Sequence, residues 1–525
     1  MNSTFQLGFS SPGKQAGAPR PTHNRSQSLF ALILGAGFSL LLATGLHAQT
    51  APVPKTQSIV QALQAHDNQK ALQLAQELVQ AYPSDPRVWL LQGITLQLLQ
   101  RPDDSLASLE HALQLDPNNV PALKAAAQLE FQGNSPRAIP FLDRLLALNP
   151  TDQTAHAMTA ALAFQQKDCA TCVTHYQKSL QVIANDLSGL SQLGACLARL
   201  NRHAEALDVY QQIADLRPQD PEAIYYLGLA QYSAKHFKDA VQTLRPLAES
   251  GSEKMRSTSL NLLAAAYEDD QQTPLAVAAL QKAIGLAPKD PDNYLDLATV
   301  SLDHGAFQLG IDVLNTGLEV VSNPAPLYLE RGVLEVESGR FDEANADFRK
   351  AAELNPLQNY SSVALGISLL QENKPEESVK IVKQRLAAAP EDATLNYLLA
   401  ELLIRTGAKP GSASFQEAEK AAERAVHTNP EFAPALDVLT ELYLRSGKAA
   451  LAEHTARLAL KSDPSDQSAL YHLIVCLRSR GDSSELPKLV QRLAEATAGR
   501  REQEKARSRF KLEEDSGSIH QETAP

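Results

Sequence analysis

A proline recurs along this chain at intervals of one or two periods of about 34 residues. Each of these prolines closes a short segment, such as Leu-Asp-Pro-Asn at 115–118 or Leu-Asn-Pro at 354–356, which follows an apolar stretch with helical spacing. Because proline has no N–H to donate and disfavours helix in the residue before it, each one is expected to end a helix. The recurring residues are Pro83, Pro117, Pro150, Pro218, Pro288, Pro356, Pro390, Pro430 and Pro464. The chain is therefore predicted to be an array of short units, each of which buries its apolar face against its neighbours.

The stretch 327–356 predicts what one unit looks like. Apolar residues recur at intervals of four and three residues, a Gly-Arg pair at 339–340 interrupts them, and the same intervals then return. This pattern indicates a helix, a turn and a second helix. The apolar positions are Leu329, Val333, Val336, Ala344, Phe348 and Ala351.

Small residues recur once in each predicted helix, where two helices must approach closely. In the first helix they are Gly93, Ala126, Gly194, Gly228, Ala264, Ala298, Gly332, Gly366 and Ala400. Their expected partners in the second helix are Ala71, Ala138, Ala206, Ala240, Ala276, Ala344, Ala418 and Ala452. This pattern, together with the prolines and a set of aromatic and Leu-Gly positions, resembles the tetratricopeptide repeat. The further matching residues are Trp89, Leu227, Tyr267, Phe348 and Tyr443.

The resemblance covers about residues 58–494 as roughly thirteen units. It implies an all-α fold, a right-handed α-solenoid of helix-turn-helix repeats, in which the first helices line a groove for a peptide or a partner's helix. The weaker units lie around Ala184, Ser252 and Ser322, where the closing proline is replaced or displaced.

The charge of the chain separates this family from another helical repeat of similar period. Pentatricopeptide arrays bind RNA and need a basic surface. This chain has 48 Lys and Arg against 60 Asp and Glu, a formal net charge of −12. Nucleic acid is therefore not expected as a partner.

The composition divides the chain into four segments: residues 1–48 as a signal peptide or membrane anchor, 49–57 as a linker, 58–494 as one continuous repeat array, and 495–525 as a basic helical and then disordered tail. The array's largest irregularity is an insert at 407–414. We expect this insert to be a tolerated loop between the two helices of one unit rather than a binding loop.

The first segment has the features of an export signal. Residues 1–28 contain basic side chains and no acid, and Leu29 to Leu46 carry no charge. Cleavage after Ala48 would give a mature chain that begins at Gln49. The alternative is an uncleaved helix at 29–46, which is nearly long enough to span a bilayer. Either reading predicts repeats outside the cytoplasm: periplasmic, secreted, or held at an inner membrane by residues 29–46.

Four cysteines are few for an exported protein, so disulfides are not expected to form its framework. Cys169 and Cys172 have the spacing of a redox pair, and Asp168 could cap the helix that they begin. We favour a structural role or a passive disulfide between these two cysteines over a redox function, because both occupy inward positions of the repeat. A zinc site would need a second pair, whereas Cys196 and Cys476 stand alone in the sequence.

Motifs that carry catalysis are absent from the sequence: there is no Gly-rich phosphate loop, no Gly-x-Ser-x-Gly, no His-Glu-x-x-His and no Asp-rich calcium loop. We therefore expect no enzyme activity, no cofactor and no metal. An enzyme subunit carrying such repeats is disfavoured because the array runs almost to residue 525.

The predicted first helices carry tyrosines and then many acids, which would suit a basic or amphipathic partner segment. The candidate partner-binding residues are Tyr225, Tyr226, Tyr232, Glu268, Asp269, Asp292, Asp296, Asp303, Glu330 and Glu337. The alternative is that these residues are ordinary solvated positions, with some tyrosines packed between units. The sequence thus favours a non-catalytic protein-binding scaffold outside the cytoplasm, and as an alternative a component of an envelope polysaccharide export or secretion and assembly machine.

Overall fold

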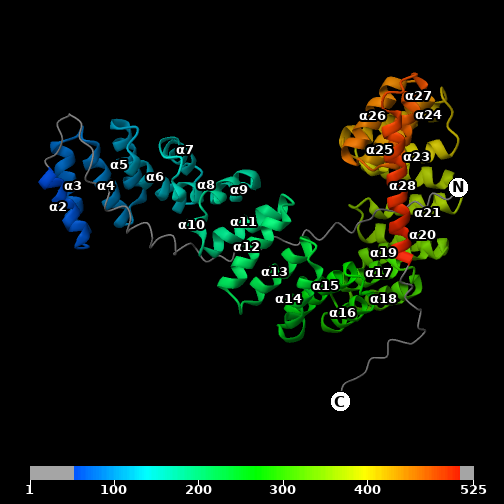
Figure 1. The fold of residues 1–525 in the computed structure, drawn as a ribbon, viewed down its shortest axis with the longest axis horizontal. Coiled ribbons are helices and arrows are strands. Elements are labelled where there is room, and N and C mark those ends of the chain that lie inside the picture. Colours follow the sequence, from blue (N-terminus) through cyan, green and yellow to red (C-terminus); the bar gives the residue numbers. More distant parts are fainter. Residues whose placement is uncertain (1–52, 509–525) are drawn as a thin grey trace, which may run out of the picture. The chain divides into compact units, whose positions relative to one another are not determined.

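The computed structural model describes residues 53–508, which form 27 α-helices and no strand. Apart from the short α10 (Leu180–Ile183), these helices form thirteen consecutive helix-turn-helix pairs (Figure 1). The predicted all-α array of about thirteen repeats is confirmed. The described helices fall into two compact units whose boundary, between Thr243 and Leu244, lies within α14 (Phe237–Ser250).

The first unit contains five complete pairs and the start of a sixth. Its helices are α2 (Val53–Gln64) and α3 (Asn68–Ala81), α4 (Pro86–Leu98) and α5 (Pro102–Leu115), α6 (Val120–Gln132) and α7 (Ala138–Leu148), α8 (Gln153–Gln165) and α9 (Cys169–Gln177), α11 (Leu187–Arg199) and α12 (His203–Leu216), and then α13 (Pro221–Ser233).

The second unit contains seven pairs beyond α14. Its helices are α15 (Glu253–Asp269) and α16 (Thr273–Leu286), α17 (Pro291–Asp303) and α18 (Phe307–Val320), α19 (Ala325–Glu337) and α20 (Phe341–Leu354), α21 (Tyr360–Gln371) and α22 (Pro375–Ala388), α23 (Ala393–Arg405) and α24 (Ala413–Thr428), α25 (Ala433–Arg445) and α26 (Ala449–Ser462), and α27 (Gln467–Ser479) and α28 (Leu486–Ser508).

The nine recurring prolines each follow the end of a second helix, as predicted. For example, α5 ends at Leu115, two residues before Pro117. The carbonyl oxygen of the closing proline then accepts a hydrogen bond, which satisfies a main-chain acceptor that the ended helix cannot use. In four units the partner is a side chain six residues later: Trp89, His156, Tyr294 or Asn396, at 2.8–3.0 Å. In three others it is an arginine of the next second helix: Arg144, Arg385 or Arg492.

The turn between the two helices of a pair has one fixed feature that the prolines did not reveal. In all thirteen described pairs, the second residue after the end of the first helix has a positive φ, between 56° and 88°. Only glycine adopts this conformation without steric cost, and asparagine tolerates it better than most residues. The positions are His66, Gln100, Asn134, Lys167, Asn201, Lys235, Gln271, Gly305, Gly339, Asn373, Gly407, Gly447 and Gly481.

The small residues allow the two helices of a pair to approach each other. A Cβ added at Gly332 would come within 2.6 Å of the Phe348 ring, and one at Gly93 within 2.7 Å of Leu109. In both cases the large side chain lies sixteen positions after the glycine. All eight alanines expected as partners are buried. Ala138, Ala206, Ala240, Ala276 and Ala344 lie twelve positions after the small residue of their first helix, and the six-residue insert widens this spacing to eighteen between Ala400 and Ala418. The serines in this register, Ser105 and Ser378, donate hydrogen bonds to the carbonyls of Gly93 and Gly366.

The three weaker units predicted from the missing prolines each have a local irregularity. Near Ala184, the second helix is only nine residues long and is followed by α10. Ser252 is the N-cap of α15, which is extended to 17 residues. Near Ser322, Pro324 begins the next first helix instead of closing the previous one.

Within residues 53–508, no helix combines the length and the apolar character that crossing a membrane requires. The apolar segment 29–46, the cleavage site after Ala48 and the tail beyond residue 508 lie outside the described residues.

Candidate partner-binding surface

The three tyrosines on α13 pack largely against neighbouring aromatic rings. Tyr226 stacks on Tyr210 of α12 at 5.9 Å between ring centroids, and Tyr225 meets Tyr226 edge-on at 5.6 Å. Burial raises the pKa of both Tyr225 and Tyr226. Tyr232 lies 5.7 Å from the ring of Phe237. Tyr226 therefore contributes to the core of the first unit, as the packing alternative anticipates.

Three of the predicted acids form a row in the second unit. Asp269, Asp303 and Glu337 are the last residues of α15, α17 and α19, and successive members are 34 positions apart, so they occupy the same place in three consecutive first helices. All three are exposed, and α17 packs against both α15 and α19. A negative charge at a helix C-terminus opposes the helix dipole and costs roughly 0.3–1 kcal/mol. The row is therefore not explained by helix stability.

Glu268 lies beside this row, but its carboxylate contacts a neighbouring histidine. Its Oε1 is 2.6 Å from Nε2 of His304, a side chain only 8% exposed. The same histidine nitrogen is 3.3 Å from Thr273 Oγ1. Glu268 thus links α15 to the turn after α17, which gives it a role in packing successive pairs.

Glu330 on α19 couples to the row electrostatically. Burial, together with the nearby carboxylate of Asp303, raises the pKa of Glu330 to about 7. Burial also raises the pKa of Glu337. The negative charge of this surface therefore increases as the pH rises through neutrality.

The remaining two acids lie on α17 and differ from the row. Asp292 is in the first turn of α17, and its backbone N–H donates to the N-cap Asp290 at 3.1 Å. An acid in a first turn stabilises the helix through its dipole, which is a structural role. Asp296 is half-buried in the middle of the helix. The second unit thus brings Asp303 and Glu330 together, with Asp269 and Glu337 in register. The tyrosines belong to the other compact unit.

A buried ionic network next to the row was not predicted. The Arg331 guanidinium donates to both carboxylate oxygens of Asp347, at 2.6 and 2.7 Å, and to Asn315 at 2.6 Å. Burial and the Asp347 charge raise the pKa of the adjacent Glu335 to about 7. Arg331 and Asp347 are sixteen positions apart, the spacing that joins Gly332 to Phe348. This sixteen-residue spacing is the one feature of the sequence from which the Arg331–Asp347 contact could have been predicted.

The cysteine pairing differs from the prediction. Cys169 forms a disulfide with Cys196 of α11, across a Cα–Cα distance of 4.8 Å, whereas Cys172 is a free, buried thiol. Packing explains the difference, because α9 lies against α11 and brings Cys196 opposite Cys169. Burial raises the pKa of Cys172 to about 12, so this thiol stays protonated and unreactive. Asp168 caps α9 as expected, accepting from the Thr171 N–H at 3.0 Å.

In the described part of the chain, no group of three or more His, Cys, Asp or Glu side chains is placed to hold a metal ion. An open cavity lies away from the row of acids, between the second helices α22 and α24.

Family models match most of the described repeats. Residues 60–190 match the model described as the cytochrome c-type biogenesis protein H TPR domain. Residues 197–254 match one tetratricopeptide repeat model, and residues 329–384, 363–426 and 440–500 match another. This chain is a tetratricopeptide repeat protein. Proteins of this kind are scaffolds for protein-protein interaction, and none of these models describes a catalytic domain.

Individual relatives are distant. The mouse protein "Tetratricopeptide repeat protein 16" is 24% identical over 297 residues, which cover 50% of this chain and 38% of that protein. The human "Protein O-mannosyl-transferase TMTC1" is 26% identical over 187 residues, or 34% of this chain and 21% of that protein. The match thus spans well under half of either relative. The alignment with the crystal structure of yeast Tom70 covers 88% of this chain and 97% of the Tom70 chain, with 16% sequence identity and a TM-score of 0.42.

Proposed function

We propose that this tetratricopeptide repeat protein holds a basic or amphipathic segment of a partner protein along the acids that end α15, α17 and α19. The observation that carries the proposal is the register of Asp269, Asp303 and Glu337. These exposed charges oppose the helix dipoles, so their recurrence is better explained by an external positive charge than by folding.

We further propose that the scaffold works outside the cytoplasm. The charge-free segment 29–46 behind a basic flank supports export. The Cys169–Cys196 disulfide agrees with an oxidising compartment, where such bonds persist. The resemblance of residues 60–190 to the cytochrome c-type biogenesis protein H TPR domain favours a second version of this function. In that version the partner belongs to an envelope assembly machine.

The test starts with capture of partners from envelope extracts by the full chain. The captured partner is then purified and titrated against the parent and against the double variant Asp303→Lys, Glu337→Lys. We expect its affinity to fall about tenfold or more, and the parent's affinity to fall as salt rises, because exposed charge pairs are screened. The control is Glu319→Lys, which reverses an exposed acid on the second helix α18.

The pH dependence has a defined sign. Below about pH 7 Glu330 is largely protonated, and above it the carboxylate carries its charge. A basic segment should therefore bind more tightly at pH 8 than at pH 6, and Glu330→Gln should reduce that difference.

The salt titration gives the opposing outcome. If the parent and the Asp303→Lys, Glu337→Lys variant bind the partner with equal affinity at both low and high salt, the row is not the recognition site.

A further inference from the structure

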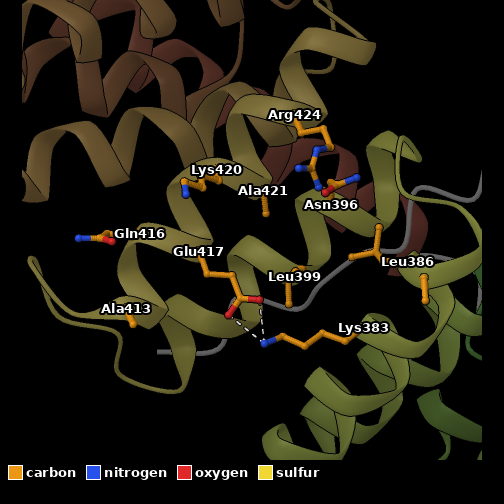
Figure 2. A pocket seen from close by; sticks show the side chains of 11 residues that line it. Lys383, Leu386, Asn396, Leu399, Ala413, Gln416, Glu417, Lys420, Ala421 and Arg424 are labelled. Carbon is orange, nitrogen blue, oxygen red and sulfur yellow. Dashed lines mark hydrogen bonds and ion pairs between the residues drawn. The ribbon is translucent and has the colours of Figure 1, made fainter.

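A cavity of about 480 Å³ lies between the second helices α22 and α24, with the first helix α23 as its floor. Figure 2 shows the side chains that line it. Leu386, Leu399 and Ala421 supply apolar surface, and three cations, Lys383, Lys420 and Arg424, surround the opening. The cavity is distinct from the row of acids, whose members are the last residues of three earlier first helices, α15, α17 and α19.

The cations exceed the acids here, in contrast to the acidic chain as a whole. Lys383 is paired with Glu417 at 2.8 Å, drawn as dashed lines in Figure 2. Lys420 is exposed and makes no hydrogen bond or ion pair with the described residues. The nearest acid to Arg424 is Glu391, at 3.9 Å, and half of the arginine side chain is exposed. The rim therefore presents one exposed cation without an ion pair, Lys420, and a half-exposed one, Arg424, whose carboxylate partner is 3.9 Å away.

The arrangement of this unit explains why Arg424 is exposed. In three other units, an arginine at the corresponding place in the second helix donates to the carbonyl of the closing proline. In this unit the closing proline is Pro390, and Asn396 Nδ2 donates a hydrogen bond to its carbonyl oxygen at 2.8 Å. Arg424 is thereby left to face the cavity. The six extra residues before α24 add to this effect, because Ala413, the first residue of the helix, forms part of the cavity wall.

Asn396 is a buried polar residue in the floor of the cavity. Asn396 is fully buried, its Nδ2 donates to the carbonyls of Pro390 and Asp392, both at 2.8 Å, and its Oδ1 has no partner. These two donations fix the orientation of the amide, because the reversed amide would place its oxygen against both carbonyls. A buried acceptor without a partner costs about 1–3 kcal/mol.

We propose that this cavity is a docking site for an extended acidic segment of a partner protein. Carboxylates of the segment pair with Lys420 and Arg424, and an apolar side chain rests against Leu386, with Leu399 beneath it. Charge complementarity selects this occupant, because the cavity is lined by three cations and one acid and would repel a basic segment. The site thus has the opposite charge preference to the row on α15, α17 and α19.

The test selects ligands without assuming a sequence. Random twelve-residue peptides displayed on phage are selected on the full chain, with an excess of the soluble Lys420→Glu, Ala387→Trp double variant present to remove peptides that bind elsewhere. The selected peptide is then titrated against the parent and each single variant. Lys420→Glu tests the charge, and Ala387→Trp fills the cavity without changing any charge. Circular dichroism confirms that the variants remain helical.

We expect the selected peptides to carry Asp or Glu beside an apolar residue, and either substitution to weaken binding about tenfold or more. Lys282→Glu, which makes the same charge change on α16, should leave the affinity unchanged. The proposal is wrong if no acidic consensus emerges, or if the selected peptide binds both variants as tightly as the parent. The acids of the proposed recognition row are intact in all of these proteins, so this result is independent of that proposal.

Discussion

At the residue scale, the turn positions show where sequence reasoning reached its limit. Five of the thirteen positive-φ positions are glycine and three are asparagine, and these recur with the period of the prolines. That signal could have located most of the turns. The other five, such as Gln100 and Lys167, carry side chains that give no such indication. Their backbone is determined by the need to join two packed helices, so tertiary structure overrides local preference there.

Two glycines of the second unit should respond oppositely to the same substitution. Gly339 has φ +76° and open space where a Cβ would lie, so Gly339→Ala should lower the free energy of unfolding by about 1 kcal/mol through backbone strain alone. Gly285 lies in α16 with equally open space, and Gly285→Ala should raise it by about 0.5 kcal/mol. Urea midpoints of the two variants measure this difference. Midpoints that shift in the same direction would contradict the assigned turn.

At the element scale, the fold was predictable because one register is repeated. The first-helix glycine, the small residue twelve positions later and the large residue sixteen positions later recur along the chain, so helix pairing followed from spacing. The acids were less predictable. Sequence placed Glu268 and Asp269 side by side as equivalent groove residues. In the structure one contacts His304 and the other ends the helix in an exposed position, because adjacent helical residues point about 100° apart.

Ala344 tests the twelve-position register directly. It is fully buried, in the place where Ser105 and Ser378 bond the facing backbone in their own units. Ala344→Leu should destabilise the second unit by about 1–3 kcal/mol, because the facing helix leaves no room for a larger side chain. Ala344→Ser should cost much less, because its hydroxyl can donate to the Gly332 carbonyl. Thermal unfolding of both variants provides the comparison, and a leucine variant as stable as the parent would refute this packing.

At the scale of the whole molecule, the sequence predicted the array but not its discontinuities. The boundary inside α14 has no compositional signal, because the apolar spacing of the helices continues through it. The wall of the cavity beside α24 includes Ala413, which belongs to an insert that the sequence presents as an ordinary loop. The cysteine pairing depends on which side chains of successive pairs meet, and that information is not contained in a Cys-x-x-Cys spacing.

The four cysteines give a final prediction for the entire chain. Cys169 and Cys196 are joined, and Cys172 and Cys476 are buried, with burial raising the pKa of both free thiols. In the native protein, an alkylating reagent should therefore modify almost none of the thiols. Denatured protein should take up two equivalents, and protein denatured after reduction should take up four, as counted by intact mass. Peptide mapping should then place the two early labels on Cys172 and Cys476. A label on Cys196 before reduction would show that the bridge joins Cys169 to another residue, and would restore the Cys169–Cys172 pairing that the sequence favoured.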